Sequence, residues 1–190
     1  HGTGTMNYTA DNTGNVLMYT GSWQSGSPNG LGIMTFQGDD LYARYEGQFK
    51  SGRRHGEGLM TYVDENRSNI LTYNGNWKNG SFHGQGIITY QEDHSSYSVY
   101  NGTFQNGLRH GEGVMTYQED HHKYQQYNGS WEAGKQNGQG IMIYNPENQW
   151  GITKYEGAWS DGKPHGDGVM TYNDGRVVTG TWENGRRSRD

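Results

Sequence analysis

Residues 100–117 read YNGTFQNGLRHGEGVMTY, and this stretch decides the fold. Its pattern, Tyr-x-Gly-x-Trp/Phe-x-x-Gly-x-x-x-Gly-x-Gly, recurs along nearly the whole chain. Copies start at Tyr19, Tyr45, Tyr73, Tyr100, Tyr127 and Tyr155, and a truncated copy surrounds Gly180; the intervals are 26, 28, 27, 27, 28 and 23 residues. A fixed period of about 20–50 residues indicates an array of one stacked unit. A residue that recurs in every copy is therefore first a stacking residue, and equal copies do not make one active site.

The quoted stretch itself predicts a β-hairpin. Alternation along its first five residues puts the rings of Tyr100 and Phe104 on one face of a strand. Asn106 and Gly107 follow as a turn signal, and the chain returns through a strand that places two glycines on the face of Met115. Large rings thus lie opposite bare backbone, which they can approach closely. Burial of each ring stabilises the fold by roughly 2–3 kcal/mol.

The composition favours a repeat built on rings and glycines over an ordinary core. Only 29% of the 190 residues are hydrophobic, and the mean hydropathy of −1.10 leans toward disorder. Aromatic residues nevertheless reach 13%, and 28 of the 32 glycines fall into four columns of the repeat. Glycine at a fixed offset marks a turn with positive φ or a place where a ring meets the backbone. We therefore predict an all-β fold, an elongated repeat array of stacked antiparallel β-hairpins that forms a single-layer ribbon with an aromatic-lined groove.

Charge, cysteine content and hydropathy exclude several classes of function. The net charge is −5 and the pI about 5.9, which gives no bias toward nucleic acid. Cysteine is absent, so the chain has no disulfide frame and no thiolate metal site. No apolar run is long enough to cross a membrane. Glycans on the sequons at Asn101 and Asn128 would interfere with stacking, so we expect a cytoplasmic protein associated with the cytoskeleton or with a membrane.

The repeated unit resembles the MORN repeat, the membrane occupation and recognition nexus unit. The resemblance rests on segments such as YNGNWKNG at 73–80 and HGDGVMTY at 165–172, and it covers essentially the whole chain. It implies a single array over residues 1–190 within a longer parent chain. Its units begin near residues 19, 45, 73, 100, 127, 155 and 178, with a partial repeat at 1–18. Similar proteins serve as scaffolds in the cytoskeleton, in cilia and at membrane junctions, or as appendages on enzymes.

The period of about 27 residues is longer than is usual for this family, and the extra residues have a pattern of their own. Three residues before each repeat Tyr lies a second apolar column: Val16, Tyr42, Ile70, Tyr97, Tyr124 and Ile152. Because the step is odd, we expect this column on the opposite face of the sheet. It would be either a satellite cluster that steadies the hairpins or a second contact surface.

The long loops carry acidic pairs, at residues 39–40, 64–65, 92–93 and 119–120. They are either solvated turn residues or a ridge for a divalent cation or a basic partner.

The predicted function is that of a non-enzymatic scaffold or adaptor. Stacked rings on a stiff array are suited to binding an extended or helical segment of a protein partner. The predicted groove residues are Tyr45, Phe49, Tyr73, Trp77, Tyr100, Phe104, Tyr127, Trp131, Tyr155 and Trp159. Trp150, on a loop that contains Pro146, either anchors a partner or packs on the neighbouring loop. Open sheet edges also favour end-to-end self-association into a homo-oligomer.

The repeated histidines do not predict a metal centre or a catalytic site. His55, His83, His110 and His165 each precede a glycine of the repeat, whereas metal ligands must converge on one point. We expect no metal and no cofactor, although His121 and His122 beside acidic residues could bind a metal adventitiously.

The alternative function is binding of acidic phospholipids, such as a phosphoinositide or phosphatidic acid, for membrane tethering. It requires a basic face, which the net charge disfavours. The basic clusters are small: Arg53 with Arg54, Arg109, and the tail residues Arg186, Arg187 and Arg189. Trp and Tyr faces beside carboxylates could also stack on sugar rings, but nothing in the spacing favours that.

Overall fold

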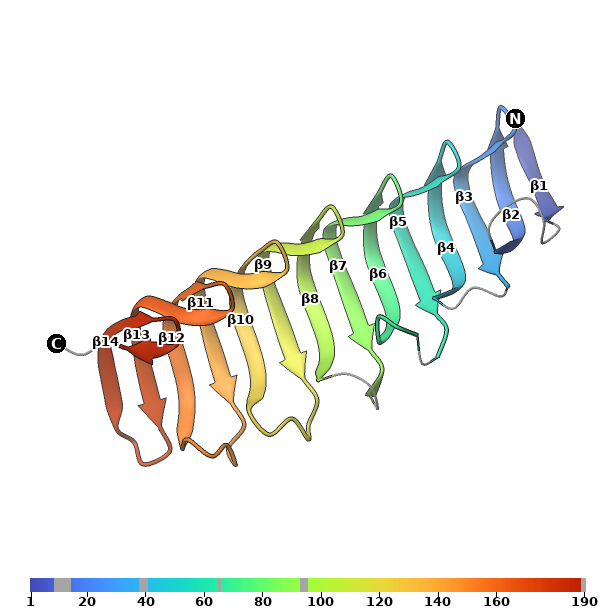
Figure 1. Ribbon diagram of the computed structural model, residues 1–190. Coiled ribbons are helices and arrows are strands. Elements are labelled where there is room, and N and C mark those ends of the chain that lie inside the picture. Colours follow the sequence, from blue (N-terminus) through green and yellow to red (C-terminus); the bar gives the residue numbers. More distant parts are fainter. Residues whose placement is uncertain (9–14, 38–40, 65, 93–95, 189–190) are drawn as a thin grey trace. The chain divides into compact units, whose positions relative to one another are not determined.

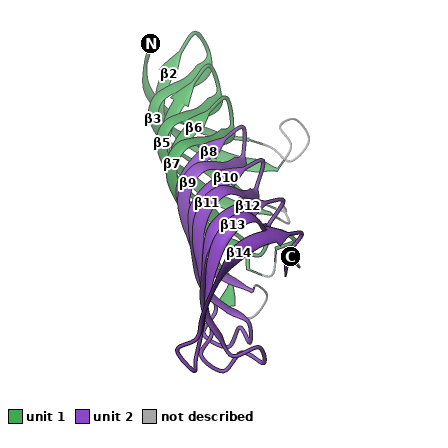
Figure 2. Cartoon of the chain, turned by 90° about the vertical axis from the view of Figure 1, so that its left-hand side faces the viewer, with its two compact units in different colours: residues 1–94 green, residues 95–190 purple. Residues whose placement is uncertain are grey.

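The computed structural model is all-β and describes residues 1–8, 15–37, 41–64, 66–92 and 96–188 (Figure 1). It divides into two compact units, residues 1–94 and residues 95–190 (Figure 2). Unit 1 contains β1 (Gly2–Asn7), β2 (Val16–Gln24), β3 (Ser27–Phe36), β4 (Tyr42–Lys50), β5 (Arg53–Tyr62), β6 (Ile70–Lys78) and β7 (Ser81–Tyr90). Unit 2 contains β8 (Tyr97–Gln105), β9 (Leu108–Tyr117), β10 (Tyr124–Glu132), β11 (Lys135–Tyr144), β12 (Ile152–Ser160), β13 (Lys163–Tyr172), β14 (Val177–Glu183) and the short β15 (Arg186–Arg187).

The strands form an open antiparallel sheet, and within each unit their order is that of the sequence. Each repeat supplies one hairpin, such as β8–β9, and each hairpin pairs with the next, as β9 does with β10. Tight turns follow one edge of each unit and longer connections follow the other (Figure 1). The prediction of an all-β array of antiparallel hairpins is confirmed.

Each tight turn has two residues with positive φ, which is the requirement of a type I′ hairpin turn. In the β8–β9 hairpin these are Asn106 at 51° and Gly107 at 84°. The amide of the turn glycine also donates to the preceding repeat, as Gly134 N does to Arg109 O over 2.9 Å. The turn glycines are therefore fixed by backbone conformation.

A bulge follows each tight turn, and the side chains on the two sides of this bulge stay on the same face of the sheet. In β8–β9 the pair Gly102–Gly113 is followed by Phe104–Arg109, so β9 has two more residues than β8 between these pairs. Gly111 lies in this bulge with a φ of 65°. Because the excess is even, Arg109 stays on the face of Phe104. We call this face, which carries the repeat Tyr and Trp/Phe columns, the aromatic face.

A second bulge reverses one prediction. Tyr97 pairs with Tyr117 and Val99 with Thr116, so one extra residue of β8 lies between the pairs. The extra residue changes the alternation, and the Tyr97 and Tyr117 rings lie 5.6 Å apart on the aromatic face. The same shift occurs in the other hairpins that begin with this column. The prediction that Val16, Tyr42, Ile70, Tyr97, Tyr124 and Ile152 lie on the opposite face was wrong.

The face opposite the aromatic face is mixed in character. Asn101 lies across from Val114, and Asn128 lies between Val114 and Ile141. Both asparagines are exposed, and their side chains point away from the rings. A glycan at either position would face solvent, so the sequons carry no argument about location.

Candidate functional site

The core of each repeat is a tyrosine held between two larger rings. Tyr127 meets Trp131 of its own repeat edge-on at 5.2 Å and Trp159 of the next repeat at 5.1 Å, with planes inclined by 88° and 82°. Tyr45 has the same arrangement with Phe49 and Trp77. Edge-to-face contacts of this kind stabilise a fold beyond the area that they bury. The ring columns therefore join successive hairpins within each unit.

The polar atoms of these rings are satisfied inside the sheet. The Tyr127 hydroxyl donates to Ser130 O over 3.0 Å, and the other repeat tyrosines make the equivalent bond three residues on. Trp131 Nε1 donates to Gly113 O of the preceding repeat over 3.1 Å. Buried hydroxyl and indole groups need such partners. The rings thus meet both requirements of a core position, packing and hydrogen bonding.

All ten predicted groove residues are core residues. Tyr45, Tyr73, Tyr100, Tyr127 and Tyr155 are 0% exposed, and Phe49, Trp77, Phe104, Trp131 and Trp159 are between 2% and 5% exposed. The structure brings them together as one column pair in each unit, as the repeat predicts. Burial leaves little of these rings for a partner, and binding at them stays a prediction.

A more accessible row of side chains lies beside the tight turns. It consists of the residue two positions after the turn glycine in the six hairpins from β2–β3 to β12–β13, and we call it the turn row: Pro28, Arg54, Phe82, Arg109, Gln136 and Pro164. Arg187, two positions after Gly185, pairs with Trp182 in the short β14–β15 ladder, but it is exposed and is not counted in this row. Each residue of the row pairs across its hairpin with the Trp/Phe column, as Arg109 does with Phe104. All but Pro28 are half-buried. The turn row varies in chemistry from repeat to repeat, and sequence reasoning missed it; the signal was a variable position at a fixed offset from the glycine column.

A second row lies at the opposite ends of the strands. The Tyr42, Tyr97 and Tyr124 rings are half-buried and contact the nearly buried Tyr62, Tyr117 and Tyr144, respectively, at 5.5–5.6 Å. We call these six residues the tyrosine row. Burial raises the pKa of Tyr62, Tyr117 and Tyr144, with the neighbouring tyrosine of the row as the next cause. The aromatic face of each unit therefore presents two strips, the turn row and the tyrosine row, and each strip includes half-buried side chains.

Trp150 is 42% exposed and lies on the connection between β11 and β12. Lys123 Nζ lies 4.9 Å from its ring centroid. The loop is held by Asn148, which is 5% exposed and donates from Nδ2 to Asn145 O and Ile152 O while its Oδ1 accepts from the Trp150 amide. Asn66 holds the connection between β5 and β6 in the same way. The two asparagines were missed, although each stands four residues before an isoleucine of the second apolar column.

The repeated histidines do not converge. Each lies in a different hairpin, beside the bulge glycine: His55, His83, His110 and His165. Within the part of the chain that the structure describes, no group of three or more His, Asp or Glu side chains could hold a metal ion. His121 and His122 stack on each other at 5.3 Å, and burial, followed by the nearby His122, lowers the pKa of His121.

The acidic loops are only partly visible. Asp64, Glu92, Glu119 and Asp120 are exposed, whereas Asp39, Asp40, Glu65 and Asp93 lie outside the described residues. The choice between solvated turns and a binding ridge stays a prediction.

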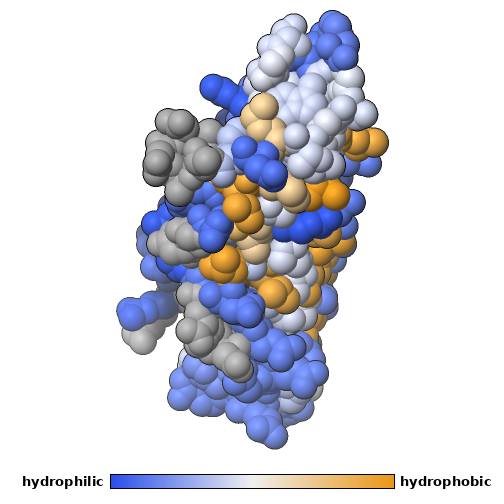
Figure 3. Space-filling view, turned by 90° about the vertical axis from the view of Figure 1, so that its right-hand side faces the viewer, coloured by the Kyte–Doolittle hydropathy of each residue, from blue (hydrophilic) through white to orange (hydrophobic). Residues whose placement is uncertain are grey.

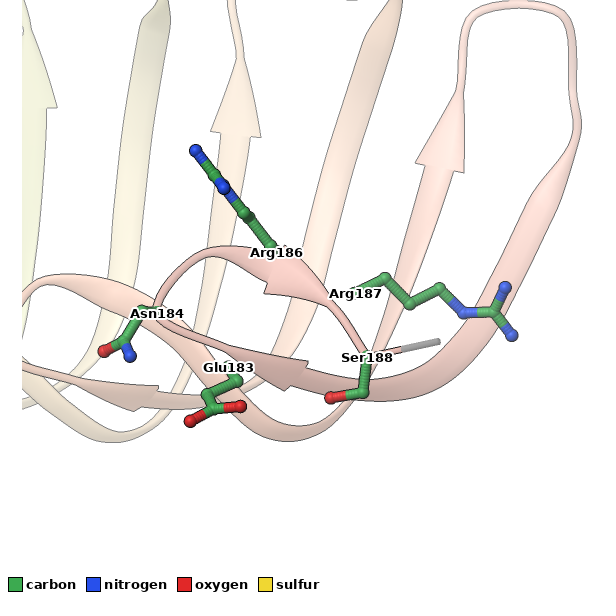
Figure 4. Close-up of a pocket in the computed structure, with 5 residues that line it drawn as sticks. All are labelled: Glu183, Asn184, Arg186, Arg187 and Ser188. Carbon is green, nitrogen blue, oxygen red and sulfur yellow. The ribbon is translucent and has the colours of Figure 1, made fainter. Parts of the chain in front are cut away.

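The C-terminal strands surround a shallow open hollow lined by Glu183, Asn184, Arg186, Arg187 and Ser188 (Figure 4). Arg186 and Arg187 point in different directions, and Arg187 Nη2 donates to Thr179 O over 3.2 Å. The hollow has no converging donors of the kind that a phosphate site needs.

Unit 1 exposes apolar side chains on three successive strands: Met6 on β1, Leu17 on β2 and Leu31 on β3 are 46%, 42% and 68% exposed. Figure 3 shows hydrophobic side chains gathered across the middle of one face of the molecule, above a hydrophilic lower end. Every residue of β1 is exposed. None of the described segments forms a helix long and apolar enough to cross a membrane.

The family model described as MORN repeat matches residues 19–40, 45–67, 73–93, 100–120, 127–148 and 155–175. The chain belongs to the MORN repeat family. Each match begins at the repeat Tyr, so one MORN repeat corresponds to one hairpin and its following connection. The copies predicted near residue 178 and at 1–18 lie outside the matched ranges. No curated protein matches the chain.

Proposed function

We propose that this MORN repeat chain is a non-enzymatic adaptor that binds an extended or helical segment of a protein partner on its aromatic face. The observation that carries the proposal is the pair of strips on that face, the turn row and the tyrosine row, each of which includes half-buried side chains. Aromatic and arginine side chains are the residue types that dominate binding energy at protein interfaces. The proposal moves the contact surface from the buried ring columns to these strips.

The strips suit a segment of regular structure better than a small molecule. Turn-row residues follow one another once per hairpin in each unit, from Arg54 to Phe82 and from Arg109 to Gln136. A peptide strand or helix that crosses successive hairpins would contact one such residue per repeat. The rigid sheet adds little ordering cost on the protein side of the complex.

Acidic phospholipid binding is supported less well. The turn row has one arginine in each unit, Arg54 in unit 1 and Arg109 in unit 2, and each is half-buried against aromatic rings. An electrostatic membrane grip uses a cluster of several cations at one surface. A cytoplasmic place in a cytoskeletal, ciliary or membrane-junction assembly, with end-to-end self-association, belongs to the same proposal as the adaptor role.

The test is site-specific photocrosslinking at two glutamines of β11. Gln136 belongs to the turn row, and Gln139, three residues on, is exposed on the opposite face. A photoreactive phenylalanine analogue at Gln136 should trap one defined protein from the native cell extract, and the same analogue at Gln139 should not. Equal crosslinking at both positions, or none at Gln136, would contradict the adaptor proposal.

A further inference from the structure

Two half-buried arginines of the turn row, Arg54 in unit 1 and Arg109 in unit 2, occupy the same position of the repeat. Arg54 lies 4.8 Å from the centroid of Trp77 and 4.9 Å from that of Tyr42. Arg109 lies 4.6 Å from Trp131 and 5.5 Å from Tyr97. Each guanidinium therefore bridges the Trp/Phe column and the tyrosine row.

The fold does not require a charge at this position. The same place in the neighbouring hairpins is filled by Pro28, Phe82, Gln136 and Pro164, and the backbone pairing there is the same. Phe82 stacks on Tyr73 at 3.8 Å, and Gln136 Nε2 reaches the Tyr117 hydroxyl at 3.5 Å. A neutral side chain therefore occupies this position in these four hairpins.

No carboxylate of the described residues neutralises either arginine. The ion pairs in this part of the chain are Arg44–Glu46, Lys135–Asp161, Lys154–Glu156 and Arg176–Asp174. Arg109 Nη1 is covered and has no acceptor among the described residues. Arginine groups that are fully buried are normally paired. The chain has 20 Asp and Glu residues and a net charge of −5, yet none of the carboxylates that the structure describes forms an ion pair with Arg54 or Arg109.

We propose that Arg54 in unit 1 and Arg109 in unit 2 are each a binding position for a carboxylate of the protein partner. This inference rests on the proposed function, because a segment of that partner must first lie on the aromatic face. A guanidinium that stacks on a ring keeps donors in its plane, and these match the two oxygens of a carboxylate. The rings around each arginine lower the local dielectric and exclude water, which strengthens such a bond. The segment therefore combines Asp or Glu with apolar residues.

The test uses a phage-displayed library of random peptides, selected on the full chain and on matched variants. Arg54→Gln and Arg109→Gln install the side chain that Gln136 already has at this position, so both variants should fold. Arg53→Gln is the control, because Arg53 adjoins Arg54 but is exposed and outside the turn row. We expect peptides selected on the parent chain to be enriched in Asp and Glu, and this enrichment to disappear on the double variant but not on Arg53→Gln.

The affinity of a selected peptide then gives the size of the contribution that each arginine makes to binding. Fluorescence anisotropy of that synthetic peptide should show about 10- to 100-fold weaker binding for each turn-row arginine replaced, and little change for Arg53→Gln. Apolar selected peptides whose binding ignores Arg54 and Arg109 would overturn the inference and leave the adaptor proposal standing. Selection of no peptide on any form would overturn the inference together with peptide binding on this face. Equal losses for Arg53→Gln would reduce the effect to net charge and would also overturn it.

Discussion

The Tyr127 ring lies edge-on against the Trp159 indole of the next repeat, with ring centroids 5.1 Å apart and planes inclined by 82°. Tyr127 Cα pairs with Met142, and Trp159 Cα pairs with Gly138, so the contact spans the β10–β11 hairpin and reaches β12. Successive repeats are therefore joined by side chains as well as by backbone hydrogen bonds. Loss of one ring should weaken two repeats, because each large ring serves the tyrosine before it and its own.

Trp131 offers a direct measure of this coupling. Trp131→Phe installs the residue that Phe104 supplies one repeat earlier, so the ring contact survives while the Nε1 bond to Gly113 O is lost. We expect a loss of about 1 kcal/mol in the free energy of unfolding. Trp131→Ala removes the ring and should cost about 3–5 kcal/mol. Denaturant unfolding of the three forms checks this, and equal costs for Phe and Ala would show that the indole bond, not packing, dominates.

The glycine columns make a sharper prediction. A Cβ at Gly113 would lie 2.6 Å from Tyr100 Cζ and 2.7 Å from Cε2, so Gly113→Ala must displace a fully buried ring. We expect a loss of about 1–3 kcal/mol, the usual range for overpacking a core. The control is Gly4→Ala in the same column: a Cβ there has Trp23 Nε1 as its nearest neighbour, at 3.8 Å.

Thermal unfolding of Gly113→Ala and Gly4→Ala shows whether the glycine is needed because a ring packs against it or because the strand accepts no side chain there. Gly4→Ala should be close to neutral, since its site is open and its φ is not positive. A large loss at Gly4 would mean that β1 cannot accept any side chain at this position, and a small loss at Gly113 would mean that the Tyr100 ring can move aside.

Most of the fold could be predicted because the same hairpin pattern recurs in every repeat. Tyr100, Gly102 and the turn at Asn106 predict the hairpin, and the aligned columns confirm the pattern in every copy. The bulge between Tyr97 and Val99 was missed, because one extra residue leaves no mark in composition yet reverses every side chain beyond it. Counting residues along one strand cannot reveal a bulge; only the partner strand shows it.

The candidate site was less predictable than the fold. The same pattern that predicts stacking at Trp77 also predicts an exposed aromatic surface, and only the structure shows that the ring is 3% exposed. The repeat pattern does not predict the turn row, because the residue type at this position differs between repeats, as Phe82 and Arg109 do. Variation at a fixed structural position is what a recognition surface needs, since constant positions serve the scaffold.

The loop that presents Trp150 gives another test. Asn148→Ala removes the bonds to Asn145 O, Ile152 O and the amides of Trp150 and Ile152. Buried backbone groups left without partners should cost about 1–3 kcal/mol in the free energy of unfolding. Amide hydrogen exchange should also become faster at Trp150. Glu147→Ala is the control, because Glu147 is exposed, and unchanged exchange in Asn148→Ala would show that other contacts order the loop.

Lowering the pH should destabilise the connection between β9 and β10, which contains His121, before it destabilises the ring columns. His121 Nδ1 accepts from the amide of Tyr124 at 2.9 Å, and burial, followed by His122, lowers the His121 pKa. A lowered pKa means that the stability from neutral His121 is present above the ordinary value near 6.5 and is lost as pH falls through the lower folded value. Proton NMR of His121 during acid titration should show a midpoint below the ordinary value near 6.5. A midpoint at or above the ordinary value would exclude this account.

Alkali tests the buried tyrosines themselves. Tyr155 is 0% exposed, its hydroxyl donates to Ala158 O over 3.1 Å, and burial, followed by the Asp167 carboxylate, raises its pKa to about 12. Burial also raises the pKa of Tyr45, Tyr73 and Tyr127.

Between the ordinary tyrosine pKa near 10 and these raised values, the unfolded chain loses protons that the folded chain keeps. The free energy of unfolding is therefore unaffected by these groups below pH 10 and falls as pH rises toward 12. Ultraviolet absorbance of tyrosinate, followed together with circular dichroism, should show the buried tyrosines ionising only as the sheet unfolds. Tyr155→Phe keeps the ring but not the proton, so its loss of stability with pH should be shallower than that of the parent chain. Ionisation of all tyrosines near their ordinary pKa with the sheet intact would show that the ring columns admit water.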